Sequence, residues 1–137
     1  MWQNNMTSKV IYLGDLRTQC EHLQSGNKMI TDAPLDNQGK AEAFSPTDTV
    51  ATALASCMFT IMGIKARDMS LDLQNSYAEV TKTMASSPRR ISKIGIDFFL
   101  PPDLSEKDKT ILENAAKTCP VIYSLHPEIE KEIKFHY

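Results

Sequence analysis

Short stretches rich in β-branched and aromatic residues open the chain and predict a small antiparallel sheet. The first stretch is 9–13 (KVIYL), and two further extended stretches flank the turn at 25–27 (Ser-Gly-Asn). From 31 to 45 turn residues follow one another without an apolar period, which predicts the longest loop of the chain. Loops of that length often carry functional residues.

Residues 46–68 have the pattern of a helix. Ser45 can cap it, Pro46 suits its first position, and Asp48 stands three residues after Ser45, as the acid of a capping box does. Apolar residues of one helical face recur at steps of four and three: Val50, Leu54, Cys57, Ile61 and Ile64. We therefore expect Cys57 to face the core near the middle of the helix. Other apolar residues lie outside this face, so we expect the helix to be covered on several sides, with a second subunit as one candidate cover.

Three further stretches predict strands. Alternation through 71–85, the turn at 86–89 and the clean alternation of 94–100 indicate a second hairpin. Residues 129–137 alternate again and predict a half-buried strand at the C-terminus.

A second helix is predicted between these strands. Ser105 and Asp108 repeat the capping signal, and the helix is expected to reach Cys119. Pro120 disfavours the helical conformation at Cys119 and suits the first position of a new helical turn. We therefore expect Cys119 at a break between two helical pieces.

This order of elements predicts an α+β fold with antiparallel sheets and no βαβ alternation. A long central helix carries Cys57, and a second helix carries Cys119. The chain has 137 residues, which is the size of one ordinary domain with one core. We expect a single domain over residues 1–137, with residues 1–8 as a flexible N-terminal extension.

The composition excludes several classes of partner. Fifteen Lys and Arg against seventeen Asp and Glu give a net charge of −2, without the basic stripe that nucleic acid binding requires. The longest uncharged stretch, 49–64, is shorter than the roughly twenty residues that span a bilayer. The N-terminus has no secretory signal pattern. We expect a cytoplasmic protein that binds neither nucleic acid nor membrane.

The cysteines are the candidates for chemistry. Three cysteines without a CxxC spacing indicate neither a disulfide framework nor a zinc ribbon, so no metal or other cofactor is expected. A free cysteine on an apolar face is most often an inert core residue. Cys119, at the start of a helical turn, has N–H groups that would lower its pKa, whereas Cys57 in mid-helix would need a cation from elsewhere.

Three segments resemble the motifs of one protein family and occur in its order. FSPTDTVATALASCMFTIMGIKA (44–66) resembles a signature in which an S-P-x-acidic-aliphatic start precedes a small-residue-rich turn and a cysteine. TCPVIYSL (118–125) resembles its Cys-Pro-aliphatic motif, and YLGDLRTQCEH (12–22) resembles its N-terminal strand with an arginine. The family is that of the OsmC/Ohr proteins, and the resemblance runs from residue 9 to the C-terminus.

The resemblance implies an OsmC-like fold, an intertwined homodimer with shared active sites, and a thiol peroxidase that reduces organic hydroperoxides. It implies that Cys57 is the peroxidatic thiolate and becomes a sulfenic acid, and that Cys119 condenses with it to a disulfide. A dithiol or a lipoylated protein would reduce this disulfide. Arg17 would stabilise the Cys57 thiolate and polarise the peroxide, and Asp48 could orient Arg17.

Alternatives remain open at several positions. In the hydroperoxide-resistance branch, the acid that binds the arginine lies ten residues before the peroxidatic cysteine, where this chain has Thr47. Asp48, one residue later, either anchors Arg17 or only caps the helix. The alternative function is a dimeric small-molecule or lipid-binding protein, or a stress protein, of the same fold with little peroxidase activity. Cys20 is interpreted as structural, and His22 as a packing or hydrogen-bonding residue.

Overall fold

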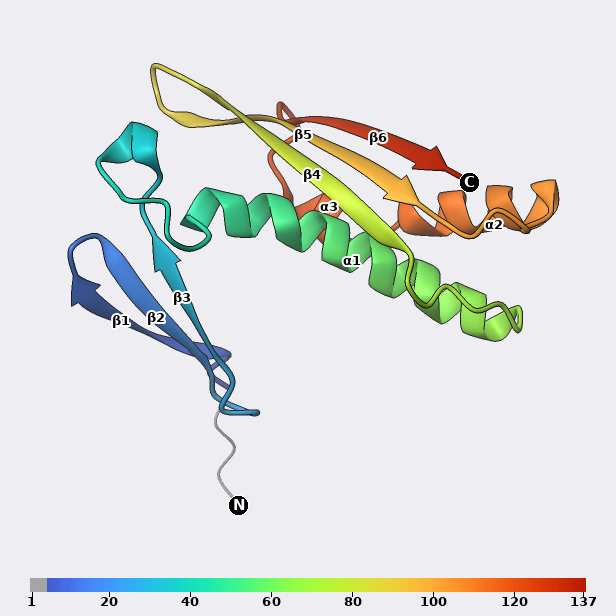
Figure 1. The fold of residues 1–137 in the computed structure, drawn as a ribbon, viewed down its shortest axis with the longest axis horizontal. Coiled ribbons are helices and arrows are strands. Elements are labelled where there is room, and N and C mark those ends of the chain that lie inside the picture. Colours follow the sequence, from blue (N-terminus) through green and yellow to red (C-terminus); the bar gives the residue numbers. More distant parts are fainter. Residues whose placement is uncertain (1–4) are drawn as a thin grey trace. The chain divides into compact units, whose positions relative to one another are not determined.

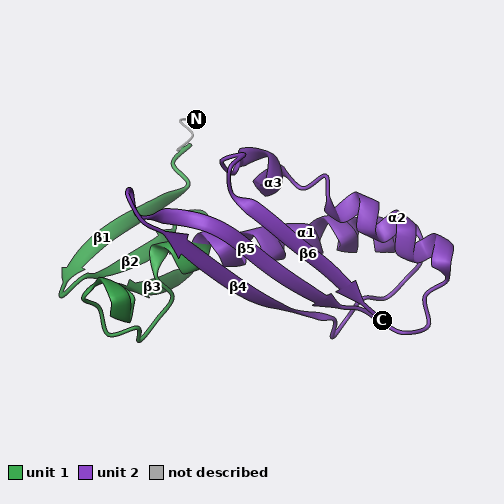
Figure 2. Cartoon of the chain, turned by 90° about the horizontal axis from the view of Figure 1, so that it is seen from above, with its two compact units in different colours: residues 1–49 green, residues 50–137 purple. Residues whose placement is uncertain are grey.

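The computed structural model describes residues 5–137. The chain divides into two compact units, residues 1–49 and residues 50–137, which are drawn in different colours in Figure 2. The first unit holds three strands, a long loop and the first turn of the long helix. The second unit holds the rest of that helix, two shorter helices and three more strands.

The first unit is built on an antiparallel sheet with the strand order β1-β2-β3 (Figure 1). Its strands are β1 (Ser8–Gly14), β2 (Arg17–His22) and β3 (Lys28–Asp32). Asp15 and Leu16 join β1 to β2 with φ values of 54° and 63°, which a type I′ hairpin turn requires at both central positions. The sheet that the sequence predicted is thus confirmed. β1 begins at Ser8, so the expected N-terminal extension is shorter by that residue, and residues 1–4 lie outside the described part of the chain.

The loop after β3 folds back against the end of that strand. It contains one short 3₁₀ helix, η1 (Leu35–Asn37). Gly39 passes so close to Ala33 that an added Cβ would lie 1.7 Å from the Ala33 carbonyl oxygen, so only glycine fits there. The loop predicted over 31–45 starts later than expected because β3 continues to Asp32.

The long helix α1 (Pro46–Asp68) has the bounds that the sequence predicted. Ser45 and Asp48 form the expected capping box: the Asp48 N–H donates to Ser45 Oγ (3.0 Å), and the Ser45 N–H donates to Asp48 Oδ2 (3.0 Å). These two bonds satisfy backbone donors at the start of the helix that have no partner within it.

The sheet of the second unit has the order β4-β5-β6. β4 (Tyr77–Ala85) and β5 (Arg90–Phe99) form the predicted hairpin, and β6 (Glu130–His136) pairs with β5 in parallel. Between β5 and β6 the chain passes through α2 (Glu106–Ala116) and α3 (Pro120–Ser124) (Figure 1). The expectation of purely antiparallel sheets without a βαβ crossover was therefore wrong. Alternation along a strand shows which residues share a face but not the direction in which its neighbour runs.

The start of β4 also differs from the prediction. The alternation that begins at Leu71 was expected to belong to a strand, but the strand starts at Tyr77. Asn75 has a φ of 72°, a left-handed conformation that a strand does not contain. Residues 71–76 therefore form a connection between α1 and β4.

The core of the second unit lies between α1 and the sheet. Six residues of α1 are buried: Ala51, Leu54, Ala55, Met58, Met62 and Ala66. They pack with inward-facing residues of β5, and Phe59 meets Phe98 edge to face with ring centroids 4.9 Å apart. The predicted helical face was wrong at its ends, because Val50 is 38% exposed and Ile64 55%. α1 is apolar over most of its circumference, so periodicity alone did not decide which side meets the sheet.

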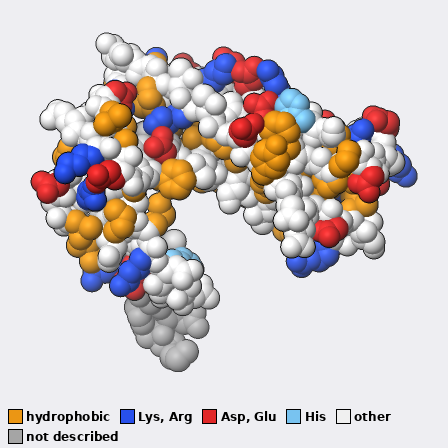
Figure 3. Space-filling model, viewed as in Figure 1, with side chains coloured by type: hydrophobic (Ala, Val, Ile, Leu, Met, Phe, Trp, Pro, Cys, Tyr) orange, Lys and Arg blue, Asp and Glu red, His pale blue; other side chains and the backbone are white. Residues whose placement is uncertain are grey.

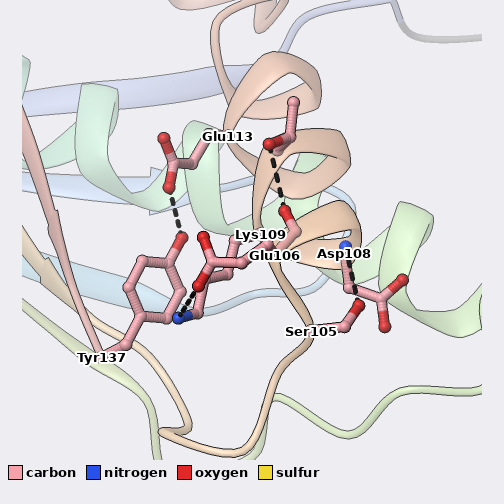
Figure 4. Close-up of polar contacts among 7 residues, drawn as sticks. Ser105, Glu106, Asp108, Lys109, Glu113 and Tyr137 are labelled. Carbon is pink, nitrogen blue, oxygen red and sulfur yellow. Dashed lines mark hydrogen bonds and ion pairs between the residues drawn. The ribbon is translucent and has the colours of Figure 1, made fainter.

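The C-terminal residue, Tyr137, contacts two residues of α2. The Tyr137 hydroxyl donates to Glu113 Oε2 (2.5 Å), and Lys109 Nζ lies 4.6 Å from the centre of the Tyr137 ring (Figure 4). Burial and the Glu113 carboxylate raise the pKa of Tyr137 above its usual value. The predicted cap of α2 is confirmed, because the Asp108 N–H donates to Ser105 Oγ (3.1 Å).

By length and composition, α1 is also the one helix among residues 5–137 that could cross a membrane. Core helices of globular domains can be equally long and apolar, so length and composition do not assign α1 to a membrane. Leu54, Met58 and Met62 of α1 are fully buried inside the second unit, as residues of such a core helix are.

Shortening a buried α1 side chain should destabilise the protein. We expect Met62→Ala to lower the free energy of unfolding by about 2–5 kcal/mol, because Met62 is 0% exposed and its loss leaves a cavity. Ser56→Ala, on the exposed side of the same helix, should change it by less than about 0.5 kcal/mol. Urea denaturation followed by circular dichroism measures both values. Equal effects of the two substitutions would contradict the burial of α1 described above.

Candidate thiol site

Cys57 lies in the middle of α1, as predicted, but at the edge of the buried face. Its side chain is half-buried, and it packs against the core cluster next to the fully buried Met58. A thiol in this position is neither inert core nor open surface. The residue is partly exposed, and the core residues that it packs against are apolar.

Cys119 lies at the expected break between two helices. It is the N-cap of α3, Pro120 occupies the first helical position, and Cys119 Sγ accepts a hydrogen bond from the Ile122 N–H (3.4 Å). α2 ends at Ala116, so the second helix stops short of this cysteine rather than carrying it. The predicted break between two helical pieces at Cys119 is confirmed. The expectation that the second helix carries Cys119 was wrong, because α2 ends three residues earlier.

The pKa of Cys119 moves opposite to the expectation. Burial raises the pKa of the Cys119 thiol, because the side chain is 0% exposed and a thiolate there would lose its hydration. The Ile122 N–H lowers the pKa, as the helix start predicted, but burial is the larger effect. Cys119 is accordingly held as a protonated thiol at neutral pH.

The two cysteines interact with each other. The neighbouring Cys57 side chain adds to the rise in the pKa of Cys119. Cys57 thus favours the protonated form of Cys119. Both are free thiols in this structure. The fold thus brings together two cysteines that are far apart in the sequence, and the third, Cys20, lies half-buried on β2 in the first unit.

Arg17 is held by two carboxylates within the first unit. Its guanidinium Nη2 lies 3.5 Å from Asp32 Oδ2 and also contacts Glu42 Oε1. Asp32 is 1% exposed, Glu42 is 58% exposed, and the Arg17 side chain is 32% exposed. Neither acid was singled out from the sequence. The pairing of β3 with β2 brings Asp32 to Arg17, and the fold of the loop brings Glu42 there. Because both contacts join residues that are distant in the chain, no short sequence pattern predicts them.

Asp48 is placed at the helix cap. Its backbone N–H and carboxylate make the two reciprocal bonds to Ser45 described above. Asp48 thus caps α1, and its other predicted role, as an anchor of Arg17, stays a prediction.

His22 takes part in the turn that follows β2. Its Nδ1 lies 2.6 Å from Ser25 Oγ, in agreement with its interpretation as a hydrogen-bonding residue. Across residues 5–137 there is no group of three or more His, Cys, Asp and Glu side chains arranged to hold a metal ion.

Comparison with known proteins places this two-cysteine fold in a family. The model of the OsmC-like protein family matches residues 39–134, which include both Cys57 and Cys119. There is no match among curated proteins. The chain belongs to the OsmC-like protein family.

Solved structures agree with this assignment. One is from Psychrobacter arcticus 273-4 and is named as a candidate osmotic stress induced and detoxification response protein. It is 56% identical, with 98% of each chain covered and a TM-score of 0.94. An organic hydroperoxide resistance protein OsmC from Legionella pneumophila shares the fold at 14% identity, with 98% of this chain and 100% of that chain covered and a TM-score of 0.75. A protein from Vibrio cholerae that is named as a candidate organic hydroperoxide resistance protein, with captopril bound in one of its active sites, shares the fold at 12% identity. The match covers 97% of this chain and 93% of that chain, with a TM-score of 0.72.

The raised pKa of Cys119 predicts a specific pH dependence of its alkylation. Because the folded pKa lies above the ordinary thiol value, we expect iodoacetamide to label Cys119 in the native protein only slowly near pH 8.5, and faster as the pH rises further. The unfolded protein should be labelled readily at pH 8.5. Peptide mass spectrometry gives the labelling rate at each pH, and equal native and unfolded rates at pH 8.5 would contradict the burial of this thiol.

Proposed function

We propose that this protein is a cysteine-based peroxidase that reduces organic hydroperoxides. The observation that carries the proposal is the pair of free thiols in one unit, with Cys57 half-buried and Cys119 buried and with a raised pKa. An accessible thiol next to a protonated one is what a two-cysteine peroxidase needs. The names of the Legionella and Vibrio proteins that share the fold support the substrate class.

The first chemical step oxidises Cys57. Its thiolate attacks one oxygen of the hydroperoxide, the O–O bond breaks, and the alcohol leaves after taking up a proton. The sulfur loses two electrons and becomes a sulfenic acid, and the peroxide gains them. Arg17 is the cation proposed to stabilise the thiolate and to polarise the peroxide, since a guanidinium stays charged even when it is partly buried.

The second step resolves the sulfenic acid. The Cys119 sulfur forms a bond to the Cys57 sulfur, and the hydroxyl of the sulfenic acid leaves as water with the Cys119 proton. An external dithiol or a lipoylated protein then reduces the disulfide by thiol exchange, which returns both thiols. The raised pKa of Cys119 suits this order, because Cys119 stays protonated while Cys57 reacts with the peroxide.

A homodimer is proposed as the working state. Figure 3 shows hydrophobic side chains at the surface of the molecule. Val10 (59% exposed) and Tyr12 (65%) of the first unit and Ile64 (55%) of the second are among the exposed apolar residues. Every residue of β1 except Gly14 is exposed, although the strand is rich in apolar side chains. Surfaces of this kind mark interaction sites. A second copy that covers them would allow sites with residues from both subunits, with Arg17 as one contribution.

The second candidate is a dimeric binding protein with little peroxidase activity. Thr47 favours it, because an acid stands at this position in the hydroperoxide-resistance branch. In such a protein the two thiols would be part of the core, and a small apolar molecule would be the ligand.

Peroxide consumption tests the proposed reaction. We expect the wild type, with dithiothreitol or dihydrolipoamide, to consume cumene hydroperoxide faster than hydrogen peroxide. Cys57→Ser should abolish turnover, because it removes the sulfur that attacks the peroxide. Cys119→Ser should still react once with peroxide and leave a trappable sulfenic acid. Cys20→Ser is the matched control and should retain turnover. A wild type without turnover, whose thiols react only after denaturation, would instead support the binding protein.

Sedimentation velocity tests the dimer. We expect a species of twice the 15.4 kDa chain mass at micromolar concentration. Val10→Lys should shift the distribution toward the single chain, because a charge would be buried in the interface. Lys9→Gln, on the same strand, is the control. A monomer at all concentrations would contradict the dimer and the shared site.

A further inference from the structure

Arg17 is shared between two carboxylates that differ in exposure. Asp32 is 1% exposed and is held from several sides: Oδ2 accepts the Glu42 backbone N–H (3.0 Å), and its own N–H donates to the Phe44 carbonyl (3.1 Å). The Glu42 side chain is 58% exposed. Because the Glu42 backbone is tied to Asp32, its side chain can leave Arg17 without moving the loop.

The surroundings of Glu42 offer room for this movement. Glu42 lines a shallow, open groove of about 400 Å³ in the first unit, whose other walls include Met29, Ile30 and Phe44. The Glu42 carboxylate can therefore turn into solvent, whereas Asp32 has no such space.

Movement of the Glu42 carboxylate away from Arg17 would change the net charge around the guanidinium. One guanidinium and two carboxylates sum to a net charge of −1, and both carboxylates contact the same nitrogen, Nη2. A thiolate or a peroxide oxygen that approaches this nitrogen competes with Glu42 and meets an excess of negative charge. With Glu42 turned away, the remaining pair of Arg17 and Asp32 is neutral.

Asp32 has an unused hydrogen-bond acceptor that could help it to hold Arg17 without Glu42. Its Oδ1 is buried and has no hydrogen-bond partner among the described residues. A guanidinium that is freed from Glu42 can donate to both oxygens of one carboxylate, which is the strongest form of this ion pair. An orphaned buried carboxylate oxygen is costly, so this second contact would compensate for the loss of Glu42.

We propose that Asp32 positions Arg17 permanently and that Glu42 is a displaceable cover over it, which must leave before Arg17 can act on a thiolate or a peroxide. Asp32 thereby takes the place of the acid that the family pattern puts at Thr47. The effect on catalysis rests on the proposed function, but the cover itself is a property of the first unit.

Labelling of Arg17 tests the cover without any peroxidase activity. Phenylglyoxal modifies accessible guanidinium groups, and peptide mass spectrometry follows Arg17 separately. We expect Glu42→Gln to raise the Arg17 labelling rate about two- to five-fold, the size that corresponds to loss of an exposed ion pair. Glu21→Gln, in β2 of the same unit, removes the same charge away from Arg17 and should leave the rate unchanged. An equal rate in the wild type and Glu42→Gln would overturn the cover.

Kinetics test the division of roles between the acids. We expect Glu42→Gln to raise kcat/KM for cumene hydroperoxide about two- to five-fold and to move the pH profile of Cys57 alkylation to lower pH. Asp32→Asn should instead lower kcat, since Arg17 would be held only by a mobile side chain. If both substitutions raised the rate equally, charge alone would explain the effect and the separate positioning role of Asp32 would be wrong. Circular dichroism checks that each variant is folded.

The two measurements separate this inference from the proposed function. Faster Arg17 labelling in Glu42→Gln together with a wild type that shows no turnover would mean that the cover exists and the peroxidase does not. Normal peroxidase turnover with unchanged labelling and unchanged kinetics would mean that the peroxidase exists and the cover does not.

Discussion

The packing of α1 against the sheet of the second unit is the contact on which the thiol site depends. Leu54, Met58 and Met62 are removed from water by this contact, and each fully buried side chain of this size contributes about 1.5–3 kcal/mol. The same contact fixes the rotation of α1 about its axis. Cys57 therefore lies at the edge of the buried face, where it packs against the core cluster that contains Cys119 and stays partly exposed.

Burial and the start of a helix act on Cys119 in opposite directions. The backbone N–H of Ile122 stabilises a thiolate, but the surrounding core excludes the water that a charge needs, and burial has the larger effect. The result is that Cys119 keeps its proton at neutral pH. In the proposed reaction, Cys57 makes the first attack and Cys119 the second.

In the first unit, two carboxylates orient the partly exposed guanidinium of Arg17. A lone exposed arginine would be flexible. Here the buried Asp32 supplies direction, while the exposed Glu42 adds a second negative charge that is weakly held. Both acids act within the unit, and the backbone bond from Glu42 to Asp32 connects them.

Local signals in the sequence were sufficient for most elements. The capping box at Ser45 and Asp48, the turn at 86–89 and the proline after Cys119 each act over three or four residues, and each is where it was predicted. The family motifs are also short stretches of neighbouring residues, so they can be read from the sequence. The match of the OsmC-like family model to residues 39–134 agrees with the family that these motifs indicate.

The features that sequence did not predict all depend on contacts between distant residues. They are the parallel direction of β6, the side of α1 that meets the sheet, the raised pKa of Cys119 and the two acids that hold Arg17. Periodicity describes one element at a time, and it carries no information on which neighbour an element meets or how much water remains around a charge. The sequence by itself thus determined the elements, their caps and the residue types available for thiol chemistry. Only the tertiary structure decided which of these residues meet, because burial and charge pairing arise when the chain packs.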